Sequence, residues 1–285
     1  MTKPRVITVF THQYPGETAG AIRRLAEEAC AAGIQVRLSS EEAQKHRLPE
    51  RSNLVLDADP SAKTDLAVVL GGDGTILLAL RAFANRKVPV FAFNFGQIGF
   101  LSTVDRDGLD DGLRRVVEGD FEVRAMPVLV VDTEDGEKVG VNDISFHRRP
   151  NSRVAELQYS VRGEALGAVR CDGLVLSTPV GSTGYNLANG GPILAWGVEG
   201  YVVSFVAPHT LTARALVVAP DDPLTVTNLS ARDSVDVTTD GRTVRELGPK
   251  QSLDVRFREE SAWLAQIPGA TFYHQIREKF GRLAS

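Results

Sequence analysis

The sequence predicts a protein of two domains, a parallel α/β domain followed by an all-β domain. Its 285 residues exceed the roughly 100–200 residues of a typical single domain. In the first third of the chain, apolar strand-like runs alternate with helix-like segments, which is typical of a parallel sheet covered by helices on both faces. From about residue 121 onwards, short runs of alternating hydrophobicity replace that pattern.

The first domain is expected to span residues 1–120 and to be Rossmann-like, because its strands and helices alternate along the chain. Helical spacing of apolar residues predicts a helix over 18–32, which Gly33 ends, and a second helix over 75–84. Apolar runs predict strands at 5–10, 34–38, 65–70 and 88–93.

The second domain is expected to span residues 121–265 and to form a sandwich-like all-β fold. Turn signals such as Glu134-Asp135-Gly136 and Asp240-Gly241 separate its short strands. The tail, residues 266–285, contains a predicted helix at 271–283, which we expect to pack back on the first domain. The predicted strands of the second domain are 128–131, 155–161, 173–177, 201–206, 224–227, 235–239 and 253–257.

The composition excludes several classes of protein. With 32 Lys and Arg against 36 Asp and Glu, the net charge is −4, and no basic stripe is present for a nucleic acid. No run approaches the roughly 18 apolar residues of a membrane span, and the N-terminus does not resemble a signal peptide, so we expect a cytoplasmic protein. Cys30 and Cys171 lie far apart without a CxxC spacing and are expected to be free thiols.

The strongest local motif is Gly71-Gly72-Asp73-Gly74-Thr75, between a predicted buried strand and a predicted helix. Its glycines let the backbone approach a ligand, and the helix N-terminus offers N–H groups to a phosphate. It is neither a Walker loop nor a GxGxxG motif. The Asp73 carboxylate suits a bound Mg²⁺ or a proton acceptor for an attacking hydroxyl. The alternative is a tight turn in which Asp73 only caps the helix.

A second loop, residues 94–101, follows the next buried strand. Loops at the carboxyl ends of neighbouring parallel strands face one crevice, so we expect this loop and the Asp73 loop to line the same site. The alternative is a plain strand-to-helix connection with Phe100 in the core.

A third segment, residues 170–192, begins with an apolar strand and continues into a loop rich in hydroxyl groups and glycines that also contains Tyr185. The loop leads into a predicted helix, with Ser182 or Thr183 as the expected helix cap. Such a loop can hydrogen-bond a polar heterocycle while Tyr185 stacks on it. A serine nucleophile is not favoured, because the GxSxG spacing is missing and no His is placed as its base.

Asn142 and Asp143 are expected to close an alternating strand that begins at Lys138, where they either grip ribose hydroxyls or turn the chain. The five His residues form no spaced metal cluster. His147 is interpreted as part of a solvated strand end, and only His209 is singled out.

The loop at residues 71–75 resembles the signature shared by NAD kinases, by diacylglycerol and sphingosine kinases and, more distantly, by phosphofructokinases. Four further segments resemble NAD kinases in their order along the chain, and the resemblance spans about residues 65 to 245. The joint pattern is specific, so the chain is identified as similar to the NAD kinase family. These segments are residues 94–101, Asn142-Asp143, residues 172–191 and Pro208-His209-Thr210-Leu211.

The resemblance implies a ligand cleft between the domains and transfer of the terminal phosphoryl group of ATP, or of inorganic polyphosphate, to the adenosine ribose 2′-hydroxyl of NAD⁺. The product is NADP⁺. The resemblance also implies Mg²⁺ or another divalent cation and a homodimer or homotetramer. The sequence does not choose between the two donors, or between NAD⁺ and NADH.

Carried over by position, the resemblance makes Asp73 the general base or a metal-linked carboxylate. It places the donor phosphates on Gly72 and Gly74, with Gly71 and Thr75 beside them. The other implied binding residues are Asn142 and Asp143 for the ribose or a base edge; Thr183, Gly184, Tyr185, Asn186, Leu187 and Ala188 around the adenine and nicotinamide ends; Arg170 and Asp172 across a subunit contact; Phe100 and His209 in the cleft; and Arg153, Thr178 and Arg242.

Three positions depart from many relatives: Asp143 replaces Glu, Gly184 replaces Ala, and Arg242 replaces Gln after the Asp-Gly pair. Asp143 keeps the charge with a shorter reach, whereas Arg242 puts a ligand contact there in doubt. Two other functions are alternatives to the NAD kinase activity. A lipid kinase of the diacylglycerol type would need a membrane-binding helix or lipidation signal, and neither is found. A non-catalytic NAD(P)-binding sensor would gain nothing from a carboxylate beside phosphates.

Overall fold

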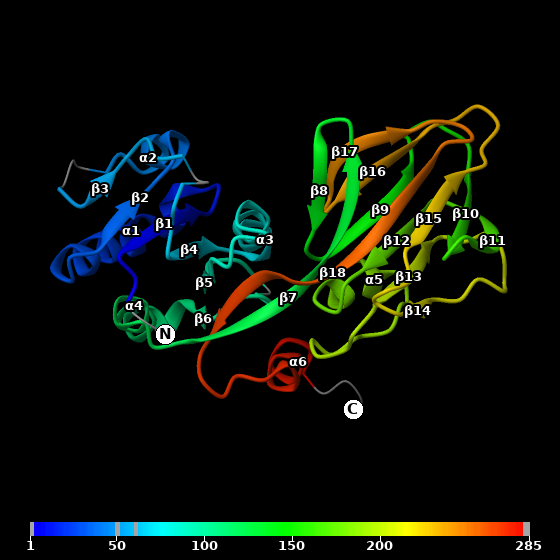
Figure 1. The fold of residues 1–285 in the computed structure, drawn as a ribbon. Coiled ribbons are helices and arrows are strands. Elements are labelled where there is room, and N and C mark those ends of the chain that lie inside the picture. Colours follow the sequence, from blue (N-terminus) through cyan, green and yellow to red (C-terminus); the bar gives the residue numbers. More distant parts are fainter. Residues whose placement is uncertain (1–2, 49–51, 60–61, 98, 282–285) are drawn as a thin grey trace. The chain divides into compact units, whose positions relative to one another are not determined.

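The chain divides into two compact units, which are described separately below (Figure 1). The computed structural model describes residues 3–48, 52–59, 62–97 and 99–281. Unit 1 comprises Met1–Ala125 and Ala262–Ser285, and unit 2 comprises Met126–Ser261. These limits differ by a few residues from the expected 120 and 265, because two long strands, β7 (Glu122–Thr133) and β18 (Ser252–Gln266), each run from one unit into the other.

Unit 1 is built on a parallel sheet with the strand order β3-β2-β1-β4-β5, and β6 pairs with the outer side of β5. Strands β4 and β5 are buried along their whole length, as expected for a sheet covered on both faces. The end of β18 joins this sheet, with Leu264 beside Val90. The strands are β1 (Val6–Thr11), β2 (Gln35–Arg37), β3 (Leu54–Val55), β4 (Leu66–Gly71), β5 (Val90–Asn94) and β6 (Val104–Asp105).

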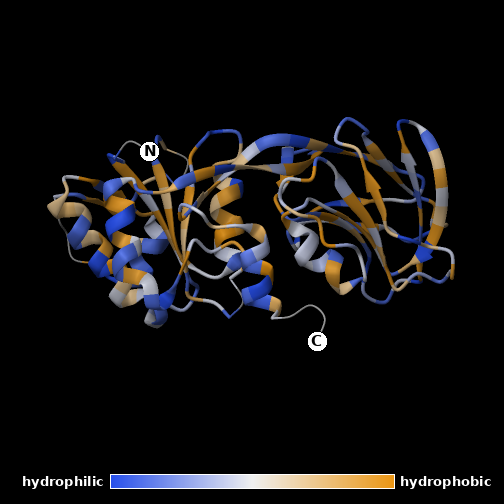
Figure 2. Ribbon diagram, turned by 90° about the horizontal axis from the view of Figure 1, so that it is seen from below, coloured by the Kyte–Doolittle hydropathy of each residue, from blue (hydrophilic) through white to orange (hydrophobic). Residues whose placement is uncertain are grey.

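The helices of unit 1 pack their apolar sides on this sheet and leave polar sides outside (Figure 2). The helices expected near 18–32 and 75–84 are confirmed as α1 and α3, both of which begin earlier than expected. The predicted C-terminal helix is α6, which belongs to unit 1 and packs Phe280 on Phe100 with ring centroids 4.9 Å apart. The helices are α1 (Pro15–Ala31), α2 (Ser40–His46), α3 (Asp73–Ala82), the 3₁₀ turn η1 (Arg106–Gly108), α4 (Leu109–Glu118) and α6 (Phe272–Phe280).

Unit 2 is a sandwich of two antiparallel sheets, which confirms the predicted all-β class. One sheet has the order β11-β10-β15-β18, and the other has the order β14-β13-β12-β9-β16-β17. Both contribute to one apolar core, for example through Leu157 and Val226 on one side and Phe146 and Leu174 on the other.

The remaining strands of unit 2 are β8 (Gly136–Gly140), β9 (Asp143–Arg148), β10 (Ala155–Val161), β11 (Glu164–Cys171), β12 (Gly173–Ser177), β13 (Tyr201–Val206), β14 (Leu216–Val218), β15 (Leu224–Asn228), β16 (Val235–Thr239) and β17 (Arg242–Leu247). Its short helices are the 3₁₀ turn η2 (Gly181–Thr183) and α5 (Tyr185–Ala188).

Two local predictions in unit 2 are wrong. The strand expected from Lys138 to Asp143 is two strands, because β8 ends at Gly140 and β9 begins at Asp143. The chain turns between them, and there the Asp240 carboxylate accepts hydrogen bonds from the backbone N–H groups of residues 141–143. The residue that caps α5 is Gly184, without a side-chain hydrogen bond, and neither Ser182 nor Thr183 has that role.

Both cysteines are free, as expected, with Cys30 exposed and Cys171 buried. Among the described residues, no helix is long and apolar enough to cross a membrane.

Candidate active site

The Asp73 loop of unit 1 holds its carboxylate against the neighbouring loop rather than against its own helix. Helix α3 begins at Asp73, and no side chain makes a capping hydrogen bond there. Instead, the two Asp73 carboxylate oxygens accept hydrogen bonds from the backbone N–H groups of Phe100 and Leu101, each at 3.1 Å. The capping alternative is therefore wrong, and the carboxylate links the two glycine-containing loops.

The two loops are also in backbone contact, which confirms that they lie at the same edge of the sheet. A Cβ added to Gly96 would lie 2.9 Å from the Gly72 Cα, closer than real Cβ atoms approach. The Phe95 N–H donates to the Gly71 carbonyl at 3.0 Å. A Cβ on Gly72 would lie 3.3 Å from the Gly96 Cα, which is tight but less severe, so Gly96 is the position at which a side chain would force the loops apart.

The start of α3 has the features of an anion site. The first N–H groups of a helix generally lack partners within it, and the helix dipole favours negative charge there. In α3 the Thr75 N–H donates to Gly72 O at 2.9 Å, so the N–H groups before it are the candidates for an anion. Gly74 is exposed, and an added Cβ would meet nothing within 4 Å. Thr75 is half-buried, and its Oγ1 would lie 2.6 Å from a Cβ on Gly71. Phe100 is half-buried against Phe280, so it is only partly available as a lining residue.

Substituting Gly96 with Ala tests the contact between the loops. The added methyl group must push Gly72 away, and we expect a loss of about 1–3 kcal/mol of stability together with reduced turnover. The matched control is Gly74→Ala, which meets open space and lies in the first turn of a helix, where Ala is favourable. Thermal unfolding of both variants checks this. Equal melting temperatures for Gly96→Ala and Gly74→Ala would contradict the close packing.

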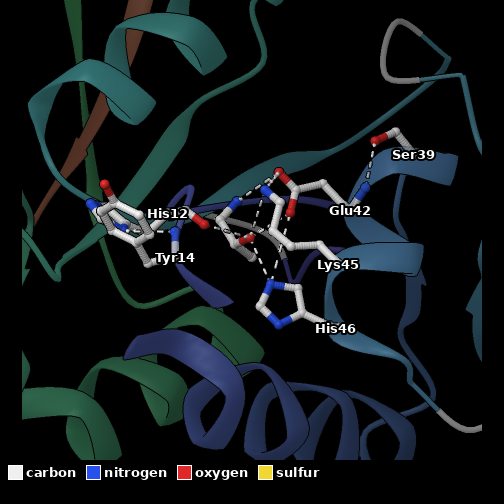
Figure 3. Close-up of polar contacts among 7 residues, drawn as sticks. His12, Tyr14, Ser39, Glu42, Lys45 and His46 are labelled. Carbon is white, nitrogen blue, oxygen red and sulfur yellow. Dashed lines mark hydrogen bonds and ion pairs between the residues drawn. The ribbon is translucent and has the colours of Figure 1, made fainter. Parts of the chain in front are cut away.

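A buried polar cluster secures the end of β1 at the same sheet edge (Figure 3). The Thr11 N–H donates to Glu42 Oε1 at 3.1 Å, and the Thr11 hydroxyl lies 2.7 Å from His46 Nε2. Lys45 forms an ion pair with Glu42 at 3.0 Å. Glu42, Lys45 and His46 all belong to α2, so this helix supplies the partners of Thr11. Burial lowers the pKa of His46, and the nearby Glu42 carboxylate opposes that shift. The next residue, His12, donates its N–H to Leu70 O at 2.8 Å, beside the Asp73 loop.

In unit 2, Asn142 and Asp143 present hydrogen-bond acceptors without protein donors. Asn142 Oδ1 is buried and has no hydrogen-bond partner among the described residues. Asp143 is only 6% exposed as a residue, and its carboxylate accepts no hydrogen bond from any residue that the structure describes. Burial, with the neighbouring Asp240 carboxylate, raises the pKa of Asp143 to about 7. Unpaired acceptors of this kind are costly, and ligand hydroxyl groups would satisfy them.

Tyr185 lies close to Asp143 and stacks on the His147 ring. Its ring stacks on His147, with centroids 5.5 Å apart and planes 27° apart. Burial raises the pKa of Tyr185, and the nearby carboxylates of Asp143 and Asp172 add to that shift. His147 lies at the end of β9, as expected, but it is half-buried and not fully solvated: its Nε2 lies 2.8 Å from Ser145 Oγ, and burial lowers its pKa.

The loop that carries Tyr185 is shaped by buried polar side chains. Asn186 is fully buried, and its Nδ2 donates to Ser182 O at 3.0 Å and to Pro192 O at 2.9 Å, so it holds the loop rather than facing outward. The Ser182 hydroxyl donates to Pro179 O at 2.7 Å and is also buried, which agrees with rejecting a serine nucleophile. Thr178 is buried too, and its hydroxyl donates to Val141 O at 2.6 Å.

The other candidate residues of unit 2 are mostly exposed. His209 is exposed, and its backbone N–H donates to Arg170 O at 2.7 Å. Asp172 pairs with Arg148 at 2.6 Å. Arg153 and Arg242 are exposed, and neither side chain has an ion-pair partner among the described residues. Around Tyr185, Gly184 and Ala188 are exposed, and Thr183 and Leu187 are half-buried.

A parallel α/β unit with an aspartate-bearing glycine loop at a helix start, followed by a β-sandwich with unpaired acceptors, suits a nucleotide-dependent phosphotransferase. The sequence matches the ATP-NAD kinase N-terminal domain over residues 12–121 and the ATP-NAD kinase C-terminal domain over residues 141–266. The chain therefore belongs to the NAD kinase family.

Curated relatives agree with this assignment. The chain is 37% identical to an NAD kinase of Gemmatimonas aurantiaca over 223 residues, covering 76% of this chain and 77% of that protein. It is 34% identical to NAD kinase 2 of Streptomyces coelicolor, covering 98% of this chain and 96% of that protein. It is 31% identical to an NAD kinase of Citrifermentans bemidjiense, covering 96% and 97%.

Two solved structures share the fold. Yeast NADH kinase complexed with NADH superposes with a TM-score of 0.88 at 23% identity, covering 100% of this chain and 90% of that chain. An NAD kinase from Archaeoglobus fulgidus in complex with ATP superposes with a TM-score of 0.74 at 23% identity, covering 97% of each chain.

Proposed function

We propose that this protein transfers the terminal phosphoryl group of ATP, or of inorganic polyphosphate, to the adenosine ribose 2′-hydroxyl of NAD⁺ and so produces NADP⁺. The observation that carries the proposal is the Asp73 carboxylate at the N-terminus of α3, beside two glycine loops in backbone contact. Phosphoryl transfer depends mainly on positioning and charge stabilisation, which such a site supplies.

In this proposal, unit 1 binds the donor phosphates and accepts the proton. The backbone around Gly71, Gly72 and Gly74, with Thr75, binds phosphate oxygens at the helix start. Asp73 takes the proton of the 2′-hydroxyl as its oxygen bonds to the terminal phosphorus, while the bond to the leaving phosphate breaks. The two N–H groups that hold the Asp73 carboxylate fix its direction, at 3.1 Å each.

Unit 2 binds NAD⁺. The unpaired acceptors of Asn142 and Asp143 receive hydrogen bonds from ribose hydroxyls, and Tyr185, supported by His147, packs on a ring of the dinucleotide. Thr183, Gly184, Leu187 and Ala188 form the adjacent surface, while the buried Asn186 and Thr178 position the backbone.

Mg²⁺ is proposed as the divalent cation. Within the described residues, no three His, Cys, Asp or Glu side chains form a metal cluster. Mg²⁺ usually binds through one or two carboxylates, substrate phosphates and water, and Asp73 is the candidate carboxylate if it is a metal ligand instead of the general base. When bound, the cation would neutralise charge on the donor phosphates.

The family resemblance further supports a homodimer or homotetramer in which Arg170 and Asp172 act at a subunit contact, and a cytoplasmic location. The same resemblance supports a contact between the ligand and four further residues: Phe100, Arg153, His209 and Arg242. The exposed arginines and His209 are the candidates that a subunit contact would explain.

The test is NADP⁺ formation by the purified protein from NAD⁺ with Mg²⁺, measured with an NADP⁺-specific dehydrogenase, with ATP and polyphosphate in parallel. We expect product with at least one donor. NAD⁺ binding without product from either donor would contradict the kinase and favour the sensor. Phosphorylation of diacylglycerol instead of NAD⁺ would favour the lipid kinase.

A further inference from the structure

Asp240 follows β16 in the tight turn to β17, and it is not one of the residues assigned above. Its φ of 44° and that of Gly241, 75°, are both left-handed, as in the two-residue hairpin turns that favour Asp-Gly or Asn-Gly. The simplest interpretation is that Asp240 serves only this turn.

The Asp240 carboxylate, however, points to the turn between β8 and β9, almost 100 positions earlier in the chain. Oδ1 accepts the N–H groups of Asn142 at 2.7 Å and Asp143 at 3.1 Å, and Oδ2 accepts that of Val141 at 3.1 Å. The Asp240 N–H in turn donates to Asp143 O at 3.0 Å. Four hydrogen bonds therefore tie one residue to the β8–β9 turn.

The carbonyl groups of the same turn are held from the other side. Thr178 donates its hydroxyl to Val141 O at 2.6 Å and its N–H to Asn142 O at 2.9 Å, and Ser177 Oγ donates to Asn142 O at 3.2 Å. Close packing also restricts the turn, because a Cβ on Gly181 would lie 2.0 Å from Asn142 O. The backbone of 141–143 is thus fixed by its own donors and acceptors, which leaves only the two side chains to bind a ligand.

We propose that Asp240 is the positioning residue of the dinucleotide site: its carboxylate fixes the backbone of residues 141–143 so that Asn142 Oδ1 and the Asp143 carboxylate are directed at the ligand hydroxyls. This inference rests on the proposed function. Asp240 does not contact the substrate in this account and acts through Asn142 and Asp143.

Asp240 has a second effect, which provides an independent readout. Besides burial, its negative charge raises the pKa of Asp143 to about 7. Among the described residues, the Tyr185 phenol on α5 also interacts electrostatically with Asp143, and Tyr185 is in turn close to the Asp172 carboxylate and stacks on His147. Removing the Asp240 charge therefore lowers the pH at which Asp143 ionises, and a residue that only made a hairpin turn would not have this effect on NAD⁺ binding.

The experiment compares Asp240→Asn with the wild type. Asn-Gly forms the same hairpin turn, so the substitution keeps the turn but removes the charge and replaces one acceptor oxygen with a donor. We expect the Kd of NAD⁺, measured by calorimetry, to rise about ten-fold at pH 8, with kcat at saturating NAD⁺ changed less than three-fold. We also expect the pH midpoint of NAD⁺ binding to fall below that of the wild type.

Glu246→Gln is the matched control. It removes one negative charge from β17 of the same hairpin, where Glu246 pairs with Arg149 at 2.9 Å, and it leaves residues 141–143 untouched. We expect wild-type NAD⁺ affinity and pH midpoint for this variant. A local readout is amide hydrogen exchange, in which Asp240→Asn should lose protection at residues 141–143 and keep it in β12.

An Asp240→Asn protein with wild-type affinity, pH midpoint and exchange would overturn the proposal. If that variant does not fold, fast exchange of the 141–143 amides in the wild-type protein would overturn it as well. A wild-type protein that forms no NADP⁺ would instead contradict the proposed function, while loss of NAD⁺ binding in Asp240→Asn would still support the positioning role.

Discussion

Asp73→Asn is expected to lower the rate of NADP⁺ formation by about 10²–10⁴-fold. The amide cannot accept the proton of the attacking hydroxyl, and only one of its two side-chain atoms can accept the N–H groups of Phe100 and Leu101. The NAD⁺ affinity should stay within a few-fold of the wild type, since the acceptors assigned to NAD⁺ lie in unit 2. Steady-state kinetics and calorimetry on the same preparation measure both quantities.

Gly74→Ala separates the effect of the loop from that of the carboxylate: its methyl group meets no protein atom within 4 Å, and because Gly74 is proposed to bind donor phosphate, we expect mainly a higher KM for the donor. Near-normal turnover in Asp73→Asn would refute the role of Asp73 as general base. A large loss of turnover in both variants would instead assign the effect to the loop backbone.

Asp143→Asn is expected to weaken NAD⁺ binding by about 10–100-fold at pH 8, because a buried ionised carboxylate makes stronger hydrogen bonds to hydroxyl groups than an amide does. The pKa of Asp143, about 7, predicts that wild-type affinity rises with pH through neutrality, as the carboxylate ionises. The variant should lack this dependence, so the two proteins should differ less at pH 5.5 than at pH 8. Calorimetric titration over this range measures it.

Stability should change with the opposite sign. The pKa of Asp143 is raised in the folded protein from its ordinary 3.8, so the stability linked to its proton is present below about pH 4 and is lost as the pH rises through about 7. Asp143→Asn should therefore melt at a higher temperature than the wild type at pH 8, with little difference at pH 4. Lower stability of the variant at pH 8 would contradict a buried, unpaired carboxylate.

The sequence predicted those features that local pattern determines. Buried apolar runs such as β4 and β5 are recognisable from hydrophobicity alone, and parallel strands place their following loops at one edge, which the approach of Gly72 to Gly96 confirms. The change to short alternating strands likewise predicted the sandwich of unit 2. These patterns alone do not identify the binding residues; those candidates come from the resemblance to the NAD kinase family.

Features that depend on distant partners were missed. The pattern from Lys138 to Asp143 reads as one strand, since nothing nearby indicates that the Asp240 carboxylate will gather the amides of residues 141–143. The sequence around His147 likewise does not indicate that its ring will stack on Tyr185. Helix α4 was not predicted, because its interior Gly112 lowers helix propensity, yet a Cβ there would lie 2.4 Å from the Phe93 ring.

The most direct test of the central claim is a ³¹P NMR spectrum of the reaction of the wild-type protein with NAD⁺, Mg²⁺ and the active donor. The control is the same reaction with 2′-deoxy-NAD⁺, in which the adenosine ribose lacks the acceptor hydroxyl. We predict a new phosphomonoester resonance that matches authentic NADP⁺ and grows as the terminal phosphate of the donor disappears. No such resonance should form with 2′-deoxy-NAD⁺. Donor consumption without a phosphomonoester, or equal product from 2′-deoxy-NAD⁺, would contradict phosphorylation of the 2′-hydroxyl.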